Sequence, residues 1–196
     1  MKIVTIFDNY LDAIVYPKDC EIVWNEEILQ YFKGEDIENI DEFQRMFALW
    51  TDPSYLYKFF KDNKHYFESD YWKDKGISFD DMCLLTQKKA LAFEASIYQS
   101  AHTLDVLFQP LDDMITNPHN VSKTKSKSSW LRIYAIKIDE NRYLVTGGAI
   151  KLTLSMQDHP ITKNELIKLE KARNYLVEKG VIDSDSYQDM LYELTI

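Results

Sequence analysis

The sequence contains little glycine, proline or cysteine. Its 196 residues include five glycines, five prolines and two cysteines. So few glycines and prolines exclude a collagen-like chain and the disordered classes rich in these residues. Cys20 and Cys83 lie far apart and share no metal-binding spacing. We therefore expect a reduced cytoplasmic protein and not a disulfide-stabilised or zinc-stabilised domain.

Long apolar runs are missing as well. No segment approaches the roughly 20 apolar residues that a helix needs to cross a bilayer. The first 16 residues carry acidic side chains inside an apolar stretch and lack a small-residue cleavage site, unlike a signal peptide. Hydrophobic residues make up 45% of the chain and charged residues 28%, as in an ordinary globular protein. The sequence thus predicts one domain over residues 1–196 with no membrane partner.

Charge is unevenly distributed along the chain. The net charge is −9, from 32 acidic and 23 basic residues, which taken alone argues against nucleic-acid binding. Residues 1–117 hold 22 acidic and 11 basic residues, whereas residues 123–179 hold 6 acidic and 12 basic residues. Attraction of a polyanion depends on the local charge more than on the total. The C-terminal half therefore remains a candidate surface for nucleic acid.

The N-terminal half combines short apolar runs with helical patterns. Residues 2–7 and 11–16 are rich in β-branched and aromatic residues, so either is a candidate strand. Residues 20 to about 105 show mainly helical spacing. Asp41 is a candidate N-cap for a helix that runs to Trp50. Asp52, followed by Pro53, is a candidate N-cap for the next helix. The longest helix is expected at about 78–108.

The C-terminal half changes to the alternating pattern of strands. Residues 130–138 and 142–152 predict an antiparallel hairpin around residues 139–141, with a bulge, bend or close backbone approach at Gly147 and Gly148. Residues 109–129 read as a polar connection, exposed and mobile at 123–129. Thr162 and Glu165 form a candidate capping box for a helix that ends at Gly180, and residues 183–194 predict another helix. The expected fold class is α+β, with an antiparallel sheet, made of one N-terminal strand and the 130–152 hairpin, packed on a large, mostly helical part.

No familiar catalytic or cofactor motif is present. Zinc, phosphate-loop, dinucleotide and nucleophile-elbow patterns are missing, and the four histidines are isolated, so we predict no metal and no cofactor. Basic and polar residues gather instead around the hairpin. They are Arg132, Tyr134, Lys137, Arg142, Lys151, His159, Lys163 and the lysines at 123, 125 and 127. Individually, each is most simply an exposed polar residue.

Together these residues suit the binding and cleavage of RNA. Strand alternation places Arg132 and Tyr134 on one face of the sheet. Cleavage without a metal needs a cation to stabilise the developing phosphorane charge and a group to transfer a proton. Arg132 and Lys151 suit the first task and His159 the second. The remaining residues would position the RNA: Lys123, Lys125, Lys127, Tyr134, Lys137, Arg142 and Lys163.

Residues 108–176 also resemble a known family. The strand Leu131-Arg132-Ile133-Tyr134, the stretch 146–151 (TGGAIK) and the helix with Thr162, Glu165, Leu166, Ala172 and Arg173 are similar to the C-terminal half of RelE/HigB-like toxins of bacterial type II toxin–antitoxin modules. The resemblance implies a RelE-like sheet and helix region at about 106–180, with residues 20–105 as a helical elaboration. It also implies metal-independent cleavage of mRNA, usually at the ribosome, silenced by a cognate helix-turn-helix antitoxin. Arg132 matches the family's strand arginine at the scissile phosphate, Lys151 a basic residue near the end of the last strand, and His159 a Tyr or His that transfers a proton.

A non-enzymatic function stays open beside this one. Family members are near half this length and basic, whereas this chain is acidic. Aromatic residues make up 14% of the chain, and exposed aromatics often mark surfaces that bind other proteins. The alternative is a protein-interaction module on a RelE-like fold.

Overall fold

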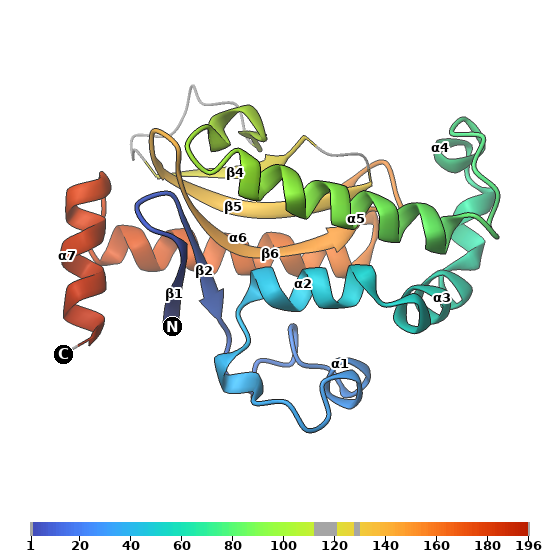
Figure 1. Ribbon diagram of the computed structural model, residues 1–196, viewed down its shortest axis with the longest axis horizontal. Helices are drawn as coiled ribbons and strands as arrows, with labels where there is room; N and C mark the ends of the chain where they lie inside the picture. Colours follow the sequence, from blue (N-terminus) through green and yellow to red (C-terminus); the bar gives the residue numbers. More distant parts are fainter. Residues whose placement is uncertain (1, 112–120, 128–129, 196) are drawn as a thin grey trace.

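The computed structural model describes residues 2–111, 121–127 and 130–195. Its fold is α+β, with a six-stranded mixed sheet between two layers of helices (Figure 1). The strand order is β1-β2-β6-β5-β4-β3. The strands are β1 (Lys2–Phe7), β2 (Leu11–Val15), β3 (Phe108–Pro110), β4 (Ser122–Ser126), β5 (Leu131–Asp139) and β6 (Arg142–Ile150).

The predicted hairpin is confirmed. β5 and β6 pair antiparallel around a tight turn in which Asn141 has a φ of 54°. The ladder shifts register where Tyr134 pairs with Gly147 and Ala135 with Val145, which leaves Thr146 as the extra residue of a bulge. The expected irregularity at the glycine pair is therefore present.

The expected antiparallel sheet is only part of the observed one. Both N-terminal segments are strands, and β2 pairs with β6 in parallel over residues 11–13 and 143–145. A parallel pair requires a long crossover between its strands, and the helical region supplies it. The sheet is therefore mixed, which corrects the prediction of a purely antiparallel one.

Helices cover both faces of the sheet. They are α1 (Glu26–Tyr31), α2 (Glu42–Thr51), α3 (Pro53–Asp62), α4 (Asp70–Lys73), α5 (Met82–Gln99), α6 (Pro160–Glu178) and α7 (Ser184–Thr195). α2 and α5 lie on one face and α6 on the other (Figure 1). Strand alternation divides β5 between two apolar cores, with Leu131, Ile133 and Ala135 in the first and Tyr134, Ile136 and Ile138 in the second.

The capping residues in the sequence predicted two helix starts correctly and one wrongly. Asp41 and Asp52 cap α2 and α3, because their side chains accept hydrogen bonds from the backbone N–H of Gln44 and Tyr55. α5 begins at Met82 and ends at Gln99, so the expected helix over 78–108 was too long. α6 begins at Pro160 with His159 as its N-cap, so the predicted Thr162 capping box is wrong.

The lysine-rich segment is a strand where the sequence predicted an exposed, mobile connection. β4 pairs with β3 on one side and with β5 on the other. The hydroxyl groups of Thr124 and Ser126 are buried and bond to the backbone of β5, at Ala135 O (2.8 Å) and Ile133 N (3.0 Å). Small hydroxyl residues alternating with lysines therefore form a strand with one buried face. Residues 112–120 and 128–129 of the expected connection lie outside the described residues.

Within the described ranges, no helix is long and apolar enough to span a bilayer.

Candidate functional site

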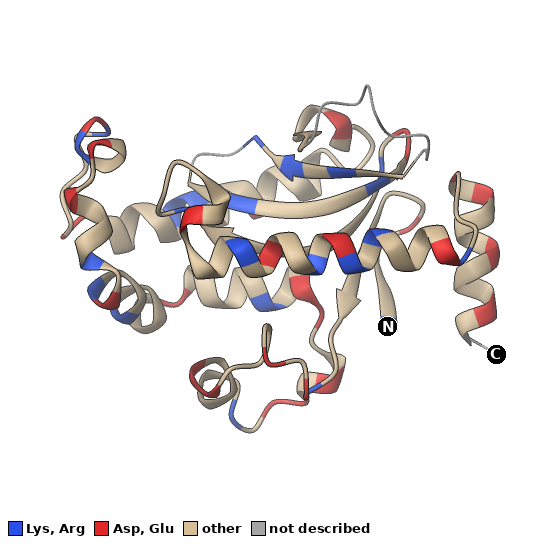
Figure 2. Ribbon diagram, turned by 180° about the vertical axis from the view of Figure 1, so that it is seen from behind, with Lys and Arg blue, Asp and Glu red and all other residues tan. Residues whose placement is uncertain are grey.

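Four basic side chains gather at one end of the sheet. We call Lys75, Lys125, Arg132 and Lys151 the basic cluster. Lys125 on β4 lies opposite Tyr134, and Arg132 on β5 precedes Tyr134 by two residues, so both side chains share its face. Lys151 directly follows β6, and its backbone N–H donates to Trp130 O (2.7 Å). Lys75 comes from the turn after α4. Figure 2 views the molecule from the α6 side and shows basic segments on neighbouring strands.

Lys125, Arg132 and Lys151 are partly removed from water, whereas Lys75 is exposed. Burial lowers the pKa of Lys151, and the positive charges of Arg132, Lys125 and Lys75 lower it further. Burial also lowers the pKa of Arg132. The ring of Tyr71 lies beneath two of the cations, with its centroid 4.1 Å from Lys75 Nζ and 5.7 Å from Lys151 Nζ. Arg132 and Lys151 are thus near enough to repel one another, and the shared catalytic role proposed for them stays a prediction.

Carboxylates do not neutralise this cluster within the described part of the chain. No ion pair joins any of its four side chains to Asp or Glu there. Among the described residues, the Arg132 guanidinium donates to one backbone carbonyl, Leu131 O, at 3.2 Å. Half-buried cations that repel one another attract an anion more strongly than isolated surface lysines do. The cluster therefore has the charge and exposure to bind a phosphate group.

Other lysines predicted to contact RNA lie outside the cluster or are paired. Lys123 pairs with Glu170 (3.1 Å) and Lys137 with Asp105 (2.8 Å). Lys127 is exposed and donates to Val106 O (3.0 Å), while Lys163 is exposed in the first turn of α6. The pairing of Lys123 and Lys137 reduces the charge they can offer to a polyanion.

Burial removes Tyr134 and Arg142 from any surface that could contact RNA. Tyr134 is fully buried, and its hydroxyl has no hydrogen-bond partner within the described ranges. Arg142 is 4% exposed, lies 3.9 Å from Asp12 and packs over the ring of Tyr187. It therefore ties β6 to β2 and α7. The alternating pattern missed this because helices cover both faces of the sheet.

His159 is buried and caps α6, where the sequence predicted a residue that transfers a proton to RNA. Only 4% of it is exposed. Its Nδ1 accepts the backbone N–H of Ile161 (3.2 Å), its Nε2 lies 3.3 Å from Asn63 Oδ1, and its ring packs against Tyr66. Burial lowers the pKa of His159, so the ring is neutral near pH 7. The predicted role in proton transfer is not supported by this placement.

A buried network of charges went unnoticed in the sequence. Glu42 on α2 accepts two hydrogen bonds from Arg45, at 2.6 and 2.8 Å, and a third from Lys168 on α6, at 2.9 Å. Lys168 also pairs with Glu165 Oε1 (2.8 Å). All four residues are buried. The glycine pair was the one feature of the sequence that could have indicated this network, because a Cβ at Gly147 would lie 2.1 Å from Glu165 Oε2.

The two carboxyl groups of this network differ in acidity. Burial raises the pKa of Glu42, but Arg45 and Lys168 outweigh it, so the pKa of Glu42 lies below its ordinary value. Burial raises the pKa of Glu165 to about 7, because Lys168 opposes it only in part and the charge of Glu42 adds to it. Glu165 therefore changes its charge near neutral pH.

Metal binding finds no support in the geometry of the described residues, which hold no group of three or more His, Cys, Asp or Glu placed to bind an ion. Comparison with protein-family models, with curated proteins and with solved structures finds no match to this chain.

Proposed function

We propose that this protein binds RNA through the basic cluster and cleaves it without a metal, as a toxin-like endoribonuclease of a toxin–antitoxin or phage-defence module. The observation that carries the proposal is the gathering of Lys75, Lys125, Arg132 and Lys151 without an acidic partner in the described chain. Consecutive phosphates of an RNA strand supply the missing negative charge. The resemblance of residues 108–176 to RelE/HigB-like toxins supports the choice of RNA.

The cluster offers a stabilising cation and an acid for phosphodiester cleavage. The 2′-hydroxyl of RNA releases its proton to solvent water and attacks the adjacent phosphorus, the bond from phosphorus to the 5′-oxygen breaks, and a 2′,3′-cyclic phosphate and a 5′-hydroxyl result. Arg132 would stabilise the charge that develops on the phosphate oxygens. Lys151 would give a proton to the leaving 5′-oxygen, because its lowered pKa makes it a better acid than an ordinary lysine. Lys151 thus takes the role first assigned to His159.

The acidic, helical N-terminal half would face other partners. The resemblance to RelE/HigB-like toxins implies that mRNA or the ribosome is the target and that a helix-turn-helix antitoxin is the inhibitor. A stripe of exposed apolar residues runs along α5 at seven-residue intervals, formed by Leu84, Leu91 and Tyr98, each more than half exposed. This stripe also favours the second candidate function, a protein-interaction module without catalysis.

Expression in a bacterium separates the two candidates. We expect wild-type protein to arrest growth and Arg132→Ala to relieve the arrest without loss of folding, since Arg132 forms no ion pair within the described residues. The purified wild type should yield 2′,3′-cyclic phosphate ends from RNA and leave the matching DNA intact. Arrest that persists with a folded Arg132→Ala protein, and RNA that remains intact, would favour the interaction module.

A further inference from the structure

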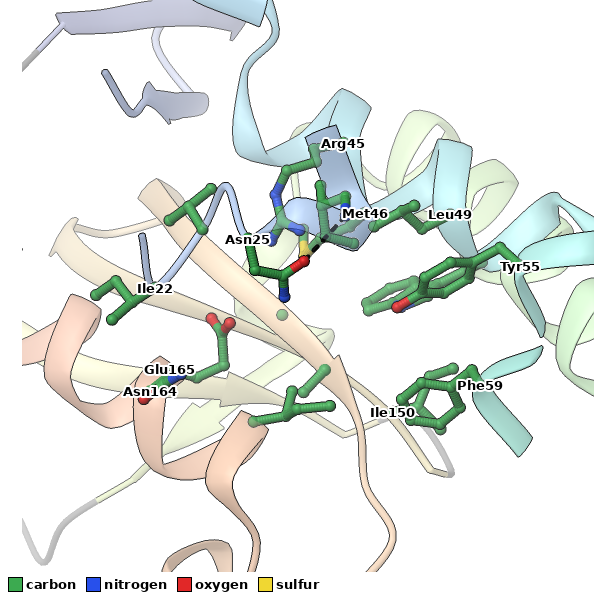
Figure 3. Close-up of a pocket in the computed structure, with 16 residues that line it drawn as sticks. Ile22, Asn25, Arg45, Met46, Leu49, Tyr55, Phe59, Ile150, Asn164 and Glu165 are labelled. Carbon is green, nitrogen blue, oxygen red and sulfur yellow. Dashed lines mark hydrogen bonds between the residues drawn. The ribbon is translucent and has the colours of Figure 1, made fainter. Parts of the chain in front are cut away.

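A pocket of about 90 Å³ lies beside the last residues of β6. β2 covers β6 only at residues 143–145, so the edge of β6 beyond Thr146 has no neighbouring strand. There α2 and α3 face the beginning of α6, and Asn25 lies between them (Figure 3). A cavity of about 10–15 Å³ holds one water, so this partly open pocket is large enough for several waters or for the edge of a small ring.

The two ends of the pocket differ in character (Figure 3). One end is polar, formed by Asn25, Arg45, Asn164 and Glu165. The other is apolar, with Leu49, Ile150 and the aromatic rings of Tyr55 and Phe59. Such a pocket suits a flat ring with hydrogen-bonding groups along one edge.

Hydrogen-bonding capacity at the polar end is unused within the described residues. Glu165 Oε1 accepts from Lys168, but Oε2 is buried and has no partner there. A buried acceptor without a partner costs about 1–3 kcal/mol, which a bound donor would recover. Asn25 Oδ1 accepts from Ile28 N (2.9 Å), and this leaves its amide N–H groups to donate. Asn164 supplies a second amide at the same end.

The pocket adjoins the basic cluster along the strands. Ala149 lines the pocket and pairs with Arg132 across the β5–β6 ladder. Ile150 lines the pocket and is followed directly by Lys151. Two residues of the cluster are therefore direct neighbours of residues that line the pocket, one across the ladder and one along the chain.

We propose that this pocket receives one unstacked base of the bound RNA and selects guanine or uracil. These bases present a ring N–H beside a carbonyl, so the N–H can donate to the Glu165 carboxylate and the carbonyl can accept from an amide of Asn25 or Asn164. Aromatic walls then hold the ring, as in other sites for single-stranded RNA. The inference rests on the proposed function, since it takes RNA as the source of the base.

Binding of short RNAs tests the assignment. Ten-residue oligoadenylates with 2′-O-methyl groups, which resist cleavage, would carry one uracil, one guanine, one abasic residue or no replacement, and Kd would be measured by fluorescence anisotropy at about pH 8. We expect the wild type to bind the uracil or guanine oligomer about tenfold more tightly than the unmodified or abasic one. Glu165→Gln and Asn164→Leu should each reduce this ratio toward one. The Lys125→Ala, Arg132→Ala, Lys151→Ala variant should weaken binding of every oligomer.

A second measurement needs no variant. RNA with a single 4-thiouridine in place of the uracil should crosslink on irradiation to residues 45–59, which contribute the aromatic walls. Equal affinity of the wild type for all oligomers, or crosslinks confined to residues 121–134, would overturn the pocket assignment while the RNA-binding proposal stands. Failure of every oligomer to bind would remove the proposed function itself. Binding of free uridine or guanosine monophosphate without any preference among the oligomers would make a free nucleotide the occupant and also overturn the assignment.

Discussion

Glu42 and Lys168 lie 126 residues apart in the sequence and form an ion pair of 2.9 Å in the core, where their side chains are 2% and 0% exposed. The pair joins α2, on one face of the sheet, to α6 on the other. The two helices meet beside Gly147, in the part of β6 that β2 does not cover. The pair therefore fixes the two helices that line the polar end of the pocket.

Replacement of Lys168 should destabilise the fold strongly. Lys168→Met leaves Glu42 with one cation and Glu165 with none of its present ion pairs. Breaking a buried pair by removing one partner costs about 3–5 kcal/mol. Urea denaturation should show a decrease of this size in the free energy of unfolding. The exposed Lys171→Met is the matched control, and a similar small effect of both changes would show that the network contributes little.

Stability should fall as the pH rises through the titration of Glu165. Its pKa is about 7 in the folded state, above the ordinary value of 4.5, so the folded state binds the proton more tightly than the unfolded state does. The associated stabilisation is complete below about pH 4.5 and is lost as the pH rises toward 7, on the order of 3 kcal/mol in all. Glu165→Gln should lack this dependence. Unfolding curves of the two proteins from pH 5 to 8 that run parallel would contradict the assignment.

Gly148 should tolerate no side chain. A Cβ there would lie 2.2 Å from Met46 Sδ and 2.5 Å from the backbone oxygen of Arg132. Gly148→Ala should therefore lower the melting temperature by several degrees, because a backbone atom cannot move aside as a side chain can. Gly34→Ala is a useful comparison, since nothing lies within 4 Å of its Cβ position and only its φ of +97° opposes the change. A smaller loss for Gly148→Ala than for Gly34→Ala would argue against this packing.

His159 should matter for folding and not for RNA. His159→Ala removes the N-cap of α6, a change that costs about 0.5–2 kcal/mol. His159→Asn can restore the cap, so it should recover much of that stability. Both variants should retain RNA cleavage when folded, as measured on the same substrate as the wild type. Loss of cleavage in a stable His159→Asn protein would show that His159 takes part in the cleavage of RNA.

Local signals in the sequence predicted the elements whose structure depends on neighbours in the chain. The hairpin around Asn141 and the helix starts at Asp41 and Asp52 are of this kind. β4 was missed because its lysines suggested solvent, whereas Thr124 and Ser126 satisfy their hydroxyl groups inside the sheet. The parallel pairing of β2 with β6 was also missed, since no local pattern encodes a strand's neighbour 132 residues away.

The candidate site was predictable in part for the same reason. Strand alternation placed Arg132 correctly, and the register then brought Lys125 and Lys151 beside it. Lys75 belongs to the cluster although it comes from a turn that is distant in the sequence. His159 does not belong to it, because its side chain caps the first turn of α6. The Glu42–Lys168 network required the full fold, because its members come from two helices on opposite faces.

The most direct test of the account is the salt dependence of RNA binding by two triple variants with equal loss of charge. One carries Lys125→Ala, Arg132→Ala and Lys151→Ala. The other carries Lys33→Ala, Lys61→Ala and Lys88→Ala, at exposed positions outside the cluster. Kd for a ten-residue uncleavable RNA would be measured between about 50 and 200 mM salt, where each phosphate contact of a single strand contributes roughly 0.7 to the slope of log K against log salt. The account predicts a steep slope for the wild type and the control, and a slope smaller by about two, with much weaker binding, for the cluster variant. Equal slopes and affinities for the two variants would contradict it.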